Sequence, residues 1–165
     1  QYANEYESKS WDVRMAKVRT VLDFPNTALR SRDLVLGVQA FQASRAYLIT
    51  SVMKQYLVQD RIGSEPVLVV VGPDNKSIRV FKARLRPNGA APDYYRNLPD
   101  SKSDPSLSVK AETPIFIDSE SGSEWNFNGC AVKGRLTGTC LTPITATRDY
   151  WFDWRNYHPD TTVFK

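Results

Sequence analysis

The run Val67-Leu68-Val69-Val70-Val71 constrains the fold of this chain more than any other feature. An unbroken apolar run rich in valine is typical of a buried β-strand, and it is far shorter than the roughly 20 residues that cross a bilayer. Pro66 precedes the run, and Gly72-Pro73-Asp74-Asn75 follows it as a turn sequence. The alternating pattern over residues 77–85 then predicts a second strand, so residues 66–85 are expected to form a β-hairpin.

The segment before this hairpin predicts a second hairpin and a helix. Residues 34–41 alternate between two faces, and residues 45–48 follow a short turn as a second strand. From residue 49 to residue 62 the spacing is helical, and Gly63 is a plausible end for the helix. The residues that share this helical stripe are Ile49, Val52, Met53, Tyr56, Leu57 and Asp60.

The remaining segments predict short elements joined by loops. One or two strands are expected within residues 107–117, followed by strands at 124–127, 131–136, 140–144 and 163–164. A helix is expected at 147–157, with Thr147 as its N-cap. Residues 86–106 are rich in proline and predict a long loop, and residues 1–32 predict an N-terminal arm or a short helix.

A chain of 165 residues fits one domain. The predicted fold class is therefore α+β: a β-rich single domain of hairpins over residues 33–165, with two or three short helices and the Pro-rich loop inserted at 86–106. No apolar run is long enough for a transmembrane segment. The chain begins at Gln1, and we expect that a processed segment or a membrane anchor could precede it.

The net charge of +4 is mildly basic. The most basic segment is 79–86, where a strand would place Lys82, Arg84 and Arg86 on one face. We interpret this face as a solvated sheet edge that discourages pairing between sheets. The alternative is a docking face for an acidic protein or an anionic membrane surface. Nucleic-acid binding is not expected, because that function requires a more concentrated basic patch with interleaved aromatic residues.

The chain has two cysteines, Cys130 and Cys140, and His158 is its single histidine. A zinc or iron–sulfur site built from this chain is not expected, since such sites usually take four thiolate or imidazole ligands. If the strands around the two cysteines pair as a hairpin, the cysteines face each other and form a disulfide, which indicates an oxidising compartment. The alternative is a pair of small buried apolar residues.

Residues 33–81 and 117–164 resemble a family of bacterial, mostly extracytoplasmic proteins, the domain-of-unknown-function family 3179. In the first block the matching residues are Val35-Leu36-Gly37-Val38, Arg45-Ala46-Tyr47, Asp60, Gly63, Pro66-Val67, Pro73 and Val80-Phe81. In the second block they are Asp118 to Trp125, Gly129 to Thr139, and Trp151 to Thr161. The resemblance implies the fold and the extracytoplasmic location of the family.

The departures from the family pattern concern its reactive side chains. Gly72 and Asn75 stand where the family has a pair of cysteines, and Gln55 stands where it has a helix histidine. Two thiols and an imidazole together would suit a metal or redox site, whereas Gly, Asn and Gln supply neither soft donors nor proton transfer near neutral pH. We call Gln55, Gly72 and Asn75 the degenerate family site, and we expect no cofactor there.

The retained motif residues have structural interpretations. Trp125, Trp151 and Trp154 are expected to fill the core. His158 is expected to cap the C-terminal end of the last helix, and Arg155 is expected to pair with Asp160 there. A catalytic role for His158 as a general base with Asp153 or Asp160 lacks a nucleophile or metal partner in the sequence.

The leading functional hypothesis is a non-catalytic accessory subunit or interaction module. Its expected partners are protein subunits of an extracytoplasmic, membrane-associated complex, with electron transfer suggested by the redox character of the family site. Trp11, Tyr94 and Tyr95 are the candidate partner contacts, because aromatic residues in an arm or a long loop are common at interfaces. In the alternative interpretation, the two tyrosines fold back onto the core of the domain.

Two other functions remain as alternatives at this point. The first is a periplasmic enzyme that works with carboxylates, for which the candidates are Glu65, Asp74, Asp118 and Glu120. The second is a small-ligand or metal-binding domain in which Asp74 and Asn75 hold a hard cation. No spacing singles out any pair of carboxylates, and Asp and Asn are common in turns for local hydrogen bonding.

Overall fold

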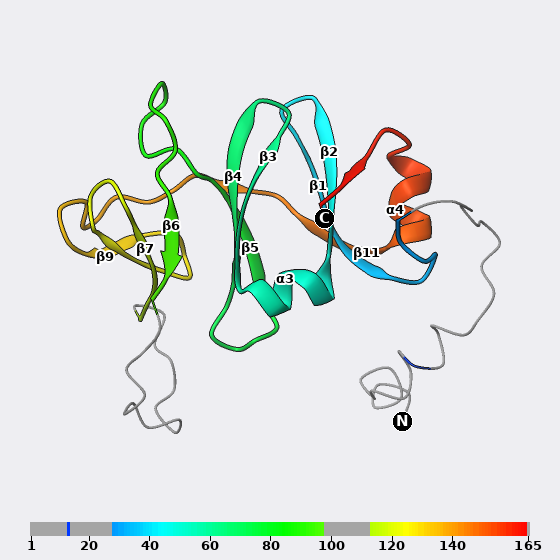
Figure 1. Ribbon diagram of the computed structural model, residues 1–165, viewed down its shortest axis with the longest axis horizontal. Coiled ribbons are helices and arrows are strands. Elements are labelled where there is room, and N and C mark those ends of the chain that lie inside the picture. Colours follow the sequence, from blue (N-terminus) through cyan, green and yellow to red (C-terminus); the bar gives the residue numbers. More distant parts are fainter. Residues whose placement is uncertain (1–12, 14–27, 98–112, 165) are drawn as a thin grey trace.

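The computed structural model describes residue 13, residues 28–97 and residues 113–164 (Figure 1). Within that part of the chain, the strands form three four-stranded sheets, which we call sheets A, B and C. The predicted β-rich α+β fold is confirmed. Residues 1–12 and 14–27 of the predicted N-terminal arm or short helix lie outside the described residues.

Sheet A contains the predicted first hairpin. Its strand order is β11-β1-β2-β12, and its strands are β1 (Leu34–Ala40), β2 (Ala43–Leu48), β11 (Thr147–Tyr150) and β12 (Thr162–Val163). All neighbours are antiparallel except β12, which runs parallel to β2. The closing strand predicted at the C-terminal end is thus an edge of this sheet.

Sheet B contains the predicted second hairpin. Its strand order is β10-β5-β4-β3, and its strands are β3 (Leu57–Ile62), β4 (Glu65–Val71), β5 (Ile78–Lys82) and β10 (Pro143–Ile144). The register of the hairpin runs from Val67 opposite Lys82 to Val71 opposite Ile78. The apolar run of β4 is buried on both faces of the sheet, which is why it is continuous rather than alternating.

The helix predicted over residues 49–62 is wrong in its second half. Helix α3 (Ile49–Gln55) ends at Tyr56, which has a φ of 61°, and the chain continues as β3. Val58 and Ile62 are the buried residues of β3, whereas the predicted helical stripe contained Leu57 and Asp60. The strand forms because β4 would otherwise bury an unpaired edge of backbone groups.

The helix predicted from Thr147 begins later. Residues 147–150 form β11, and helix α4 (Trp151–Tyr157) has Tyr150 rather than Thr147 as its N-cap. Leu34 pairs with Tyr150 and Gly37 pairs with Thr147, so β11 closes the open edge of β1. A hydrogen-bonding partner distant in the sequence therefore overrides the local helical pattern.

Sheet C comes from segments in which the sequence predicts a loop and short strands. Its strand order is β6-β7-β8-β9, and its strands are β6 (Tyr94–Arg96), β7 (Pro114–Asp118), β8 (Glu124–Asn126) and β9 (Ala131–Lys133). β6 lies within the segment predicted to be a Pro-rich loop. Residues 98–106 of that loop and residues 107–112 of the next predicted strand lie outside the described residues.

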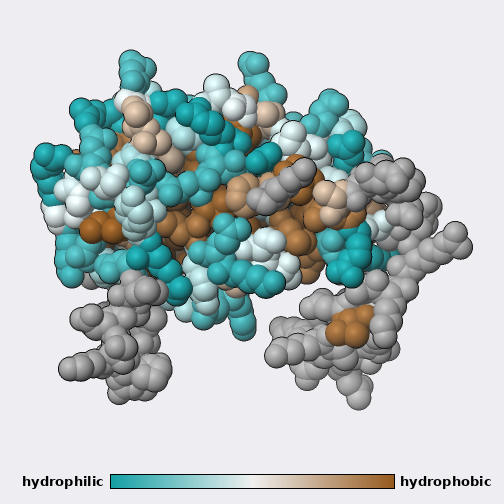
Figure 2. Space-filling model, in the orientation of Figure 1, coloured by the Kyte–Doolittle hydropathy of each residue, from teal (hydrophilic) through white to brown (hydrophobic). Residues whose placement is uncertain are grey.

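The elements stack as layers in the order sheet C, sheet B, sheet A and α4, which Figure 1 shows from left to right. One apolar core lies between sheets B and A, where Val67, Val69 and Val71 of β4 meet Leu36 and Val38 of β1. A second core lies between sheets B and C, and a third lies between sheet A and α4. In the same orientation as Figure 1, Figure 2 shows hydrophobic residues across the middle of the visible face, with hydrophilic residues above and below them.

The helices of the described residues are short. Both α3 and α4 have seven residues. No helix in the described ranges is long and apolar enough to cross a membrane.

Candidate functional site

The three positions of the degenerate family site gather at one end of sheet B. Gln55 is the last residue of α3, Gly72 directly follows β4, and Asn75 lies in the turn to β5. The Val71 amide donates a hydrogen bond to the Tyr56 carbonyl (2.9 Å), so the C-terminal ends of α3 and β4 lie side by side. The Asn75 amide donates to the Gly72 carbonyl (3.0 Å) and closes the turn.

The space beside Gly72 is filled by Phe127. A Cβ atom built at Gly72 would lie 3.0 Å from Phe127 Cζ and 2.9 Å from Asp74 Oδ1. The distance to Asp74 Oδ1 is too short for a carbon side chain, the distance to Phe127 is a tight contact, and Gly72 is buried. A cysteine at this position would therefore require Phe127 or Asp74 to move.

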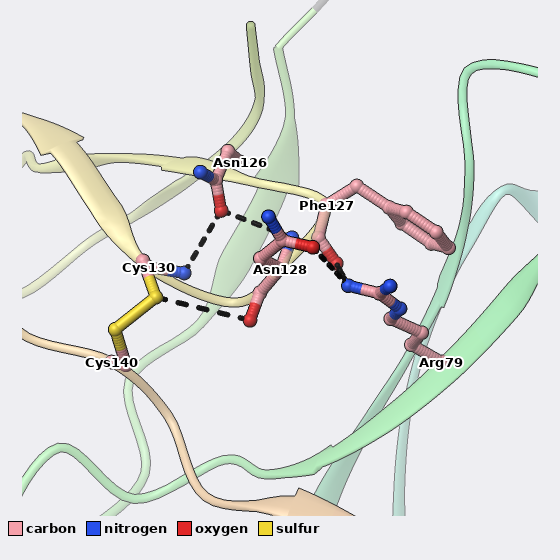
Figure 3. Close-up of a disulfide and its surroundings, with 6 residues drawn as sticks. All are labelled: Arg79, Asn126, Phe127, Asn128, Cys130 and Cys140. Atoms are coloured by element: carbon pink, nitrogen blue, oxygen red, sulfur yellow. Dashed lines mark hydrogen bonds between the residues drawn. A yellow bond between two sulfur atoms is a disulfide. The ribbon is translucent and has the colours of Figure 1, made fainter. Parts of the chain in front are cut away.

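Phe127 is held in place by Arg79 of β5. The Arg79 guanidinium lies 4.5 Å from the centre of the Phe127 ring, a cation–π contact. Its Nη1 atom also donates to the Phe127 carbonyl (3.3 Å) and to the Asn128 side-chain oxygen, as Figure 3 shows. One arginine of sheet B thus fixes both the ring and the backbone of the residue that covers Gly72.

The predicted disulfide between Cys130 and Cys140 is confirmed, with an S–S distance of 2.03 Å. The two cysteines face each other in an antiparallel bridge, as the hairpin argument requires. The Asn126 side-chain oxygen accepts hydrogen bonds from the amides of Asn128 and Cys130 (3.0 Å each), which closes the turn that carries Phe127 (Figure 3). The disulfide joins this turn to the segment that leads into β10.

The carboxylate of Asp74 closes the turn in which it lies. It accepts hydrogen bonds from the Ser77 hydroxyl (2.5 Å), the Ser77 amide (2.9 Å) and the Lys76 amide (3.0 Å). These hydrogen bonds, the Ser77 hydroxyl first, lower the pKa of Asp74 to about 2. Both oxygens are engaged in local bonding, which is the ordinary role of aspartate in a turn.

The other candidate carboxylates have separate partners. Glu65 pairs with Arg84 at 3.2 Å, and Glu120 pairs with Arg86. In the described ranges, no group of three or more His, Cys, Asp and Glu residues is arranged to hold a metal ion. The structure therefore does not bring Glu65, Asp74, Asp118 and Glu120 together into one acid–base site.

Asp118 is buried and organises the turn between β7 and β8. It accepts hydrogen bonds from the Ser121 hydroxyl (2.6 Å), the Ser121 amide (2.5 Å) and the Trp125 indole N–H (2.9 Å). Burial raises the pKa of Asp118, but these hydrogen bonds outweigh burial and the net pKa is lowered. The Asp118-to-Trp125 motif thus forms one buried structural unit.

The structure corrects the prediction that Tyr94 contacts a partner. Because β6 pairs with β7, its side chains alternate between the two faces, and Tyr94 points into the core with 2% of its surface exposed. Its hydroxyl donates to the Ala83 carbonyl (2.7 Å), and its backbone N–H and C=O both bond to the Gln59 side-chain amide. Tyr95 points outward and is 56% exposed, whereas Trp11 lies outside the described residues.

The basic face predicted for Lys82, Arg84 and Arg86 is not formed. β5 ends at Lys82, so the strand alternation does not extend to the two arginines. Lys82 lies over the ring of Phe41 at 5.1 Å, and the two arginines pair with different acidic residues. The three side chains therefore contact three different residues and do not form one basic surface.

The first family block contains an ion pair that sequence reasoning missed. Arg45 of β2 and Asp60 of β3 form a two-pronged contact, with Nε–Oδ2 at 2.7 Å and Nη2–Oδ1 at 3.1 Å. Burial, followed by the negative charge of Asp60, raises the pKa of the neighbouring Tyr47. Both residues of the pair belong to matching motifs, but the helix predicted for Asp60 hid their proximity.

The second block packs onto the first through Trp154. A Cβ atom at Gly37 would lie 2.3 Å from the Trp154 ring, so only glycine allows this approach. The Trp154 indole N–H donates to the Thr161 hydroxyl (3.0 Å).

His158 occupies the predicted C-cap, where its amide donates to the Trp154 carbonyl. Arg155 donates to the Thr161 carbonyl (3.3 Å), so the prediction that it pairs with Asp160 is wrong.

The chain matches a family described as a protein of unknown function (DUF3179) over residues 2–161. It therefore belongs to this family, as the resemblance predicted. No curated protein and no solved structure was found to match the chain.

Proposed function

We propose that this member of the DUF3179 family is a non-catalytic interaction module of an extracytoplasmic assembly. The observation that carries the proposal is the packing of Phe127, which Arg79 holds, against Gly72 of the degenerate family site. A side chain larger than glycine at this position would require Asp74 to shift and Phe127 to give way slightly. The candidate carboxylates Asp74, Glu65 and Glu120 are engaged in a turn and in ion pairs.

The disulfide supports the extracytoplasmic part of the proposal. Disulfides persist in oxidising compartments and are rare where thiols are kept reduced. We further propose that the assembly is associated with a membrane and takes part in electron transfer. That part rests on the family pattern, in which a cysteine pair and a helix histidine would suit a redox site.

Tyr95 and Arg96 of β6 are the proposed contact residues. Tyr95 is 56% exposed, and Arg96 is exposed and lies 3.7 Å from the centre of the Tyr56 ring. Tyrosine and arginine are the residue types that most often dominate binding energy at protein interfaces. Strand alternation turns Arg96 to the opposite face of β6 from Tyr95, next to the end of α3, so a partner that contacts both residues would cover the edge strand β6.

Site-specific photo-crosslinking in native membranes tests the proposal. A photoreactive residue replaces Tyr95 in one variant and Tyr157 in a control variant, because Tyr157 is also an exposed tyrosine, at 72%. We expect a discrete crosslinked protein from position 95 that is absent from position 157. Identical products from both positions would contradict the contact surface, and no discrete product from position 95 would contradict the interaction module.

A measurement on the purified protein tests the non-catalytic part. We expect elemental analysis to find no stoichiometric transition metal. A metal bound at one equivalent and lost in a Gln55→Ala or Asn75→Ala variant would contradict a closed site.

A further inference from the structure

A cavity of about 360 Å³ lies where the chain passes from sheet B to sheet A. β10 pairs with β5 and β11 pairs with β1, so residues 143–150 bridge the edges of the two sheets. The cavity has an apolar part and a polar part, and its lining residues are Leu36, Ile78, Ala146, Lys76, Ser77 and Arg148. Its volume is at the lower end of the range for small-molecule sites.

The cavity contains two unpaired cations. Four lysine and arginine side chains have no ion pair, hydrogen bond or aromatic ring contact in the described residues: Lys54, Lys76, Arg135 and Arg148. Two of these four line this one cavity, and they come from segments about 70 residues apart in the chain. Both residues are exposed, and two cations that line one cavity without an acidic partner favour the binding of an anion.

The acidic residues nearest in sequence do not neutralise this pair. Asp149 follows Arg148 on β11, but strand alternation places it on the opposite face, and its carboxylate accepts the Tyr150 amide (2.7 Å). Asp74 lies in the same turn as Lys76, and its oxygens accept hydrogen bonds from Ser77 and from the Lys76 amide. Neither acid forms an ion pair with Lys76 or Arg148 in the described part of the chain.

The geometry of the strands gives the cavity its two chemical parts. Leu36 of β1 is directly opposite Arg148 of β11, so their side chains lie on the same face of sheet A. Lys76 and Ser77 come from the turn that precedes β5, and Ile78 begins that strand. A lining with both cationic and aliphatic groups is suited to a ligand with an anionic head and an apolar body.

We propose that this cavity binds a small monocarboxylate whose apolar body packs against Leu36, Ile78 and Ala146. The carboxylate lies between Arg148 and Lys76, where the guanidinium offers two parallel N–H donors and the ammonium adds a point charge. The site is separate from the degenerate family site and does not depend on the proposed interaction with a partner.

A titration of the isotopically labelled full chain, followed by amide NMR, tests the site with hexanoate as the probe. We expect saturable shifts at residues 76–78 and 146–148. Hexanol carries the apolar body without the charge, and inorganic phosphate carries the charge without the apolar body. We expect both to bind at least about tenfold more weakly than hexanoate. Equal binding of hexanol or phosphate would overturn the proposed ligand class, and no saturable shift with hexanoate would overturn the site.

Two control variants separate the site from general electrostatic attraction. Arg148→Gln is expected to weaken hexanoate binding about tenfold or more, because one charge-assisted pair is lost. Lys54→Gln and Arg135→Gln each remove an unpaired cation outside the cavity, and we expect them to leave the affinity unchanged. Loss of affinity to the same degree in all three variants would overturn the proposal, as would full affinity in Arg148→Gln.

Discussion

Two regions of this protein carry motifs of the same family, and they differ in what their side chains do. In the first region, motif residues contact one another across the layers. Trp154 of α4 packs against Gly37 of sheet A, and Arg45 of sheet A pairs with Asp60 of sheet B. At the bend after β4, Gly72 and Asn75 belong to the degenerate family site, and Phe127 lies against Gly72. The first region therefore joins the layers through contacts between motif residues, whereas the second is a turn closed by local hydrogen bonds and covered by Phe127 at Gly72.

The comparison separates structural motifs from chemical ones. A residue such as Asp118 is buried with three hydrogen bonds to Ser121 and Trp125, and losing it would leave buried donors without partners. A cysteine at the bend has no comparable structural task, because a turn of Gly-Pro-Asp-Asn closes through backbone bonds and Asp74. The bend therefore keeps its conformation without a cysteine.

The largest expected effect on stability comes from the contacts that join the layers. Trp154→Ala should destabilise the protein by about 3–5 kcal/mol, because it empties the space between α4 and sheet A. Chemical denaturation followed by circular dichroism measures this change. Tyr157→Ala on the same helix is the control, since this side chain is 72% exposed and its loss should cost little. Similar losses in the two variants would contradict the role assigned to Trp154.

The disulfide connects to the bend through the turn that carries Phe127. Replacing both cysteines by serine should cost about 2–3 kcal/mol, since the bridge closes a short loop with a sequence separation of 10. The amide resonance of Gly72 should shift as well, because Phe127 loses its fixed position. A shift confined to residues 126–141, with Gly72 unchanged, would contradict the proposed link. Intact-mass analysis with and without reductant confirms the bridge in the parent chain.

The fit of Phe127 against Gly72 is expected to have a smaller effect on stability. Gly72→Ala should cost about 1–3 kcal/mol, because the added methyl group would lie within 3.0 Å of the ring. The same substitution in a Phe127→Ala background should cost clearly less, and a double-mutant cycle measures the difference. An equal cost in both backgrounds would mean that Phe127 does not close the bend.

The smallest expected effect concerns Asp74. Its folded pKa of about 2 lies below its ordinary value of 3.8, so its contribution to stability is present above that value and is lost as the pH falls towards about 2. NMR titration of the side-chain carboxyl measures the pKa directly. Ser77→Ala should raise it, because the Ser77 hydroxyl is the main cause of the lowering. A pKa that does not change in this variant would contradict the hydrogen-bonded turn.

A good part of the site was predictable from the sequence. The disulfide followed from two cysteines ten residues apart with glycines between them. The ring that fills the bend did not follow, because Phe127 lies more than fifty residues from Gly72 in the chain. Nothing local to Phe127 indicates which segment it will cover.

The amino-acid sequence by itself determined the two hairpins around β1 and β4, the C-cap at His158 and the β-rich fold class, because these depend on alternation and turn chemistry over short distances. Only the tertiary structure decided that residues 57–62 and 147–150 are strands rather than helix. Both segments have patterns that local propensity leaves ambiguous, and each forms a strand because an open sheet edge must satisfy its backbone hydrogen bonds. The same long-range pairing buried Tyr94, exposed Tyr95 and brought Lys76 and Arg148 to one cavity.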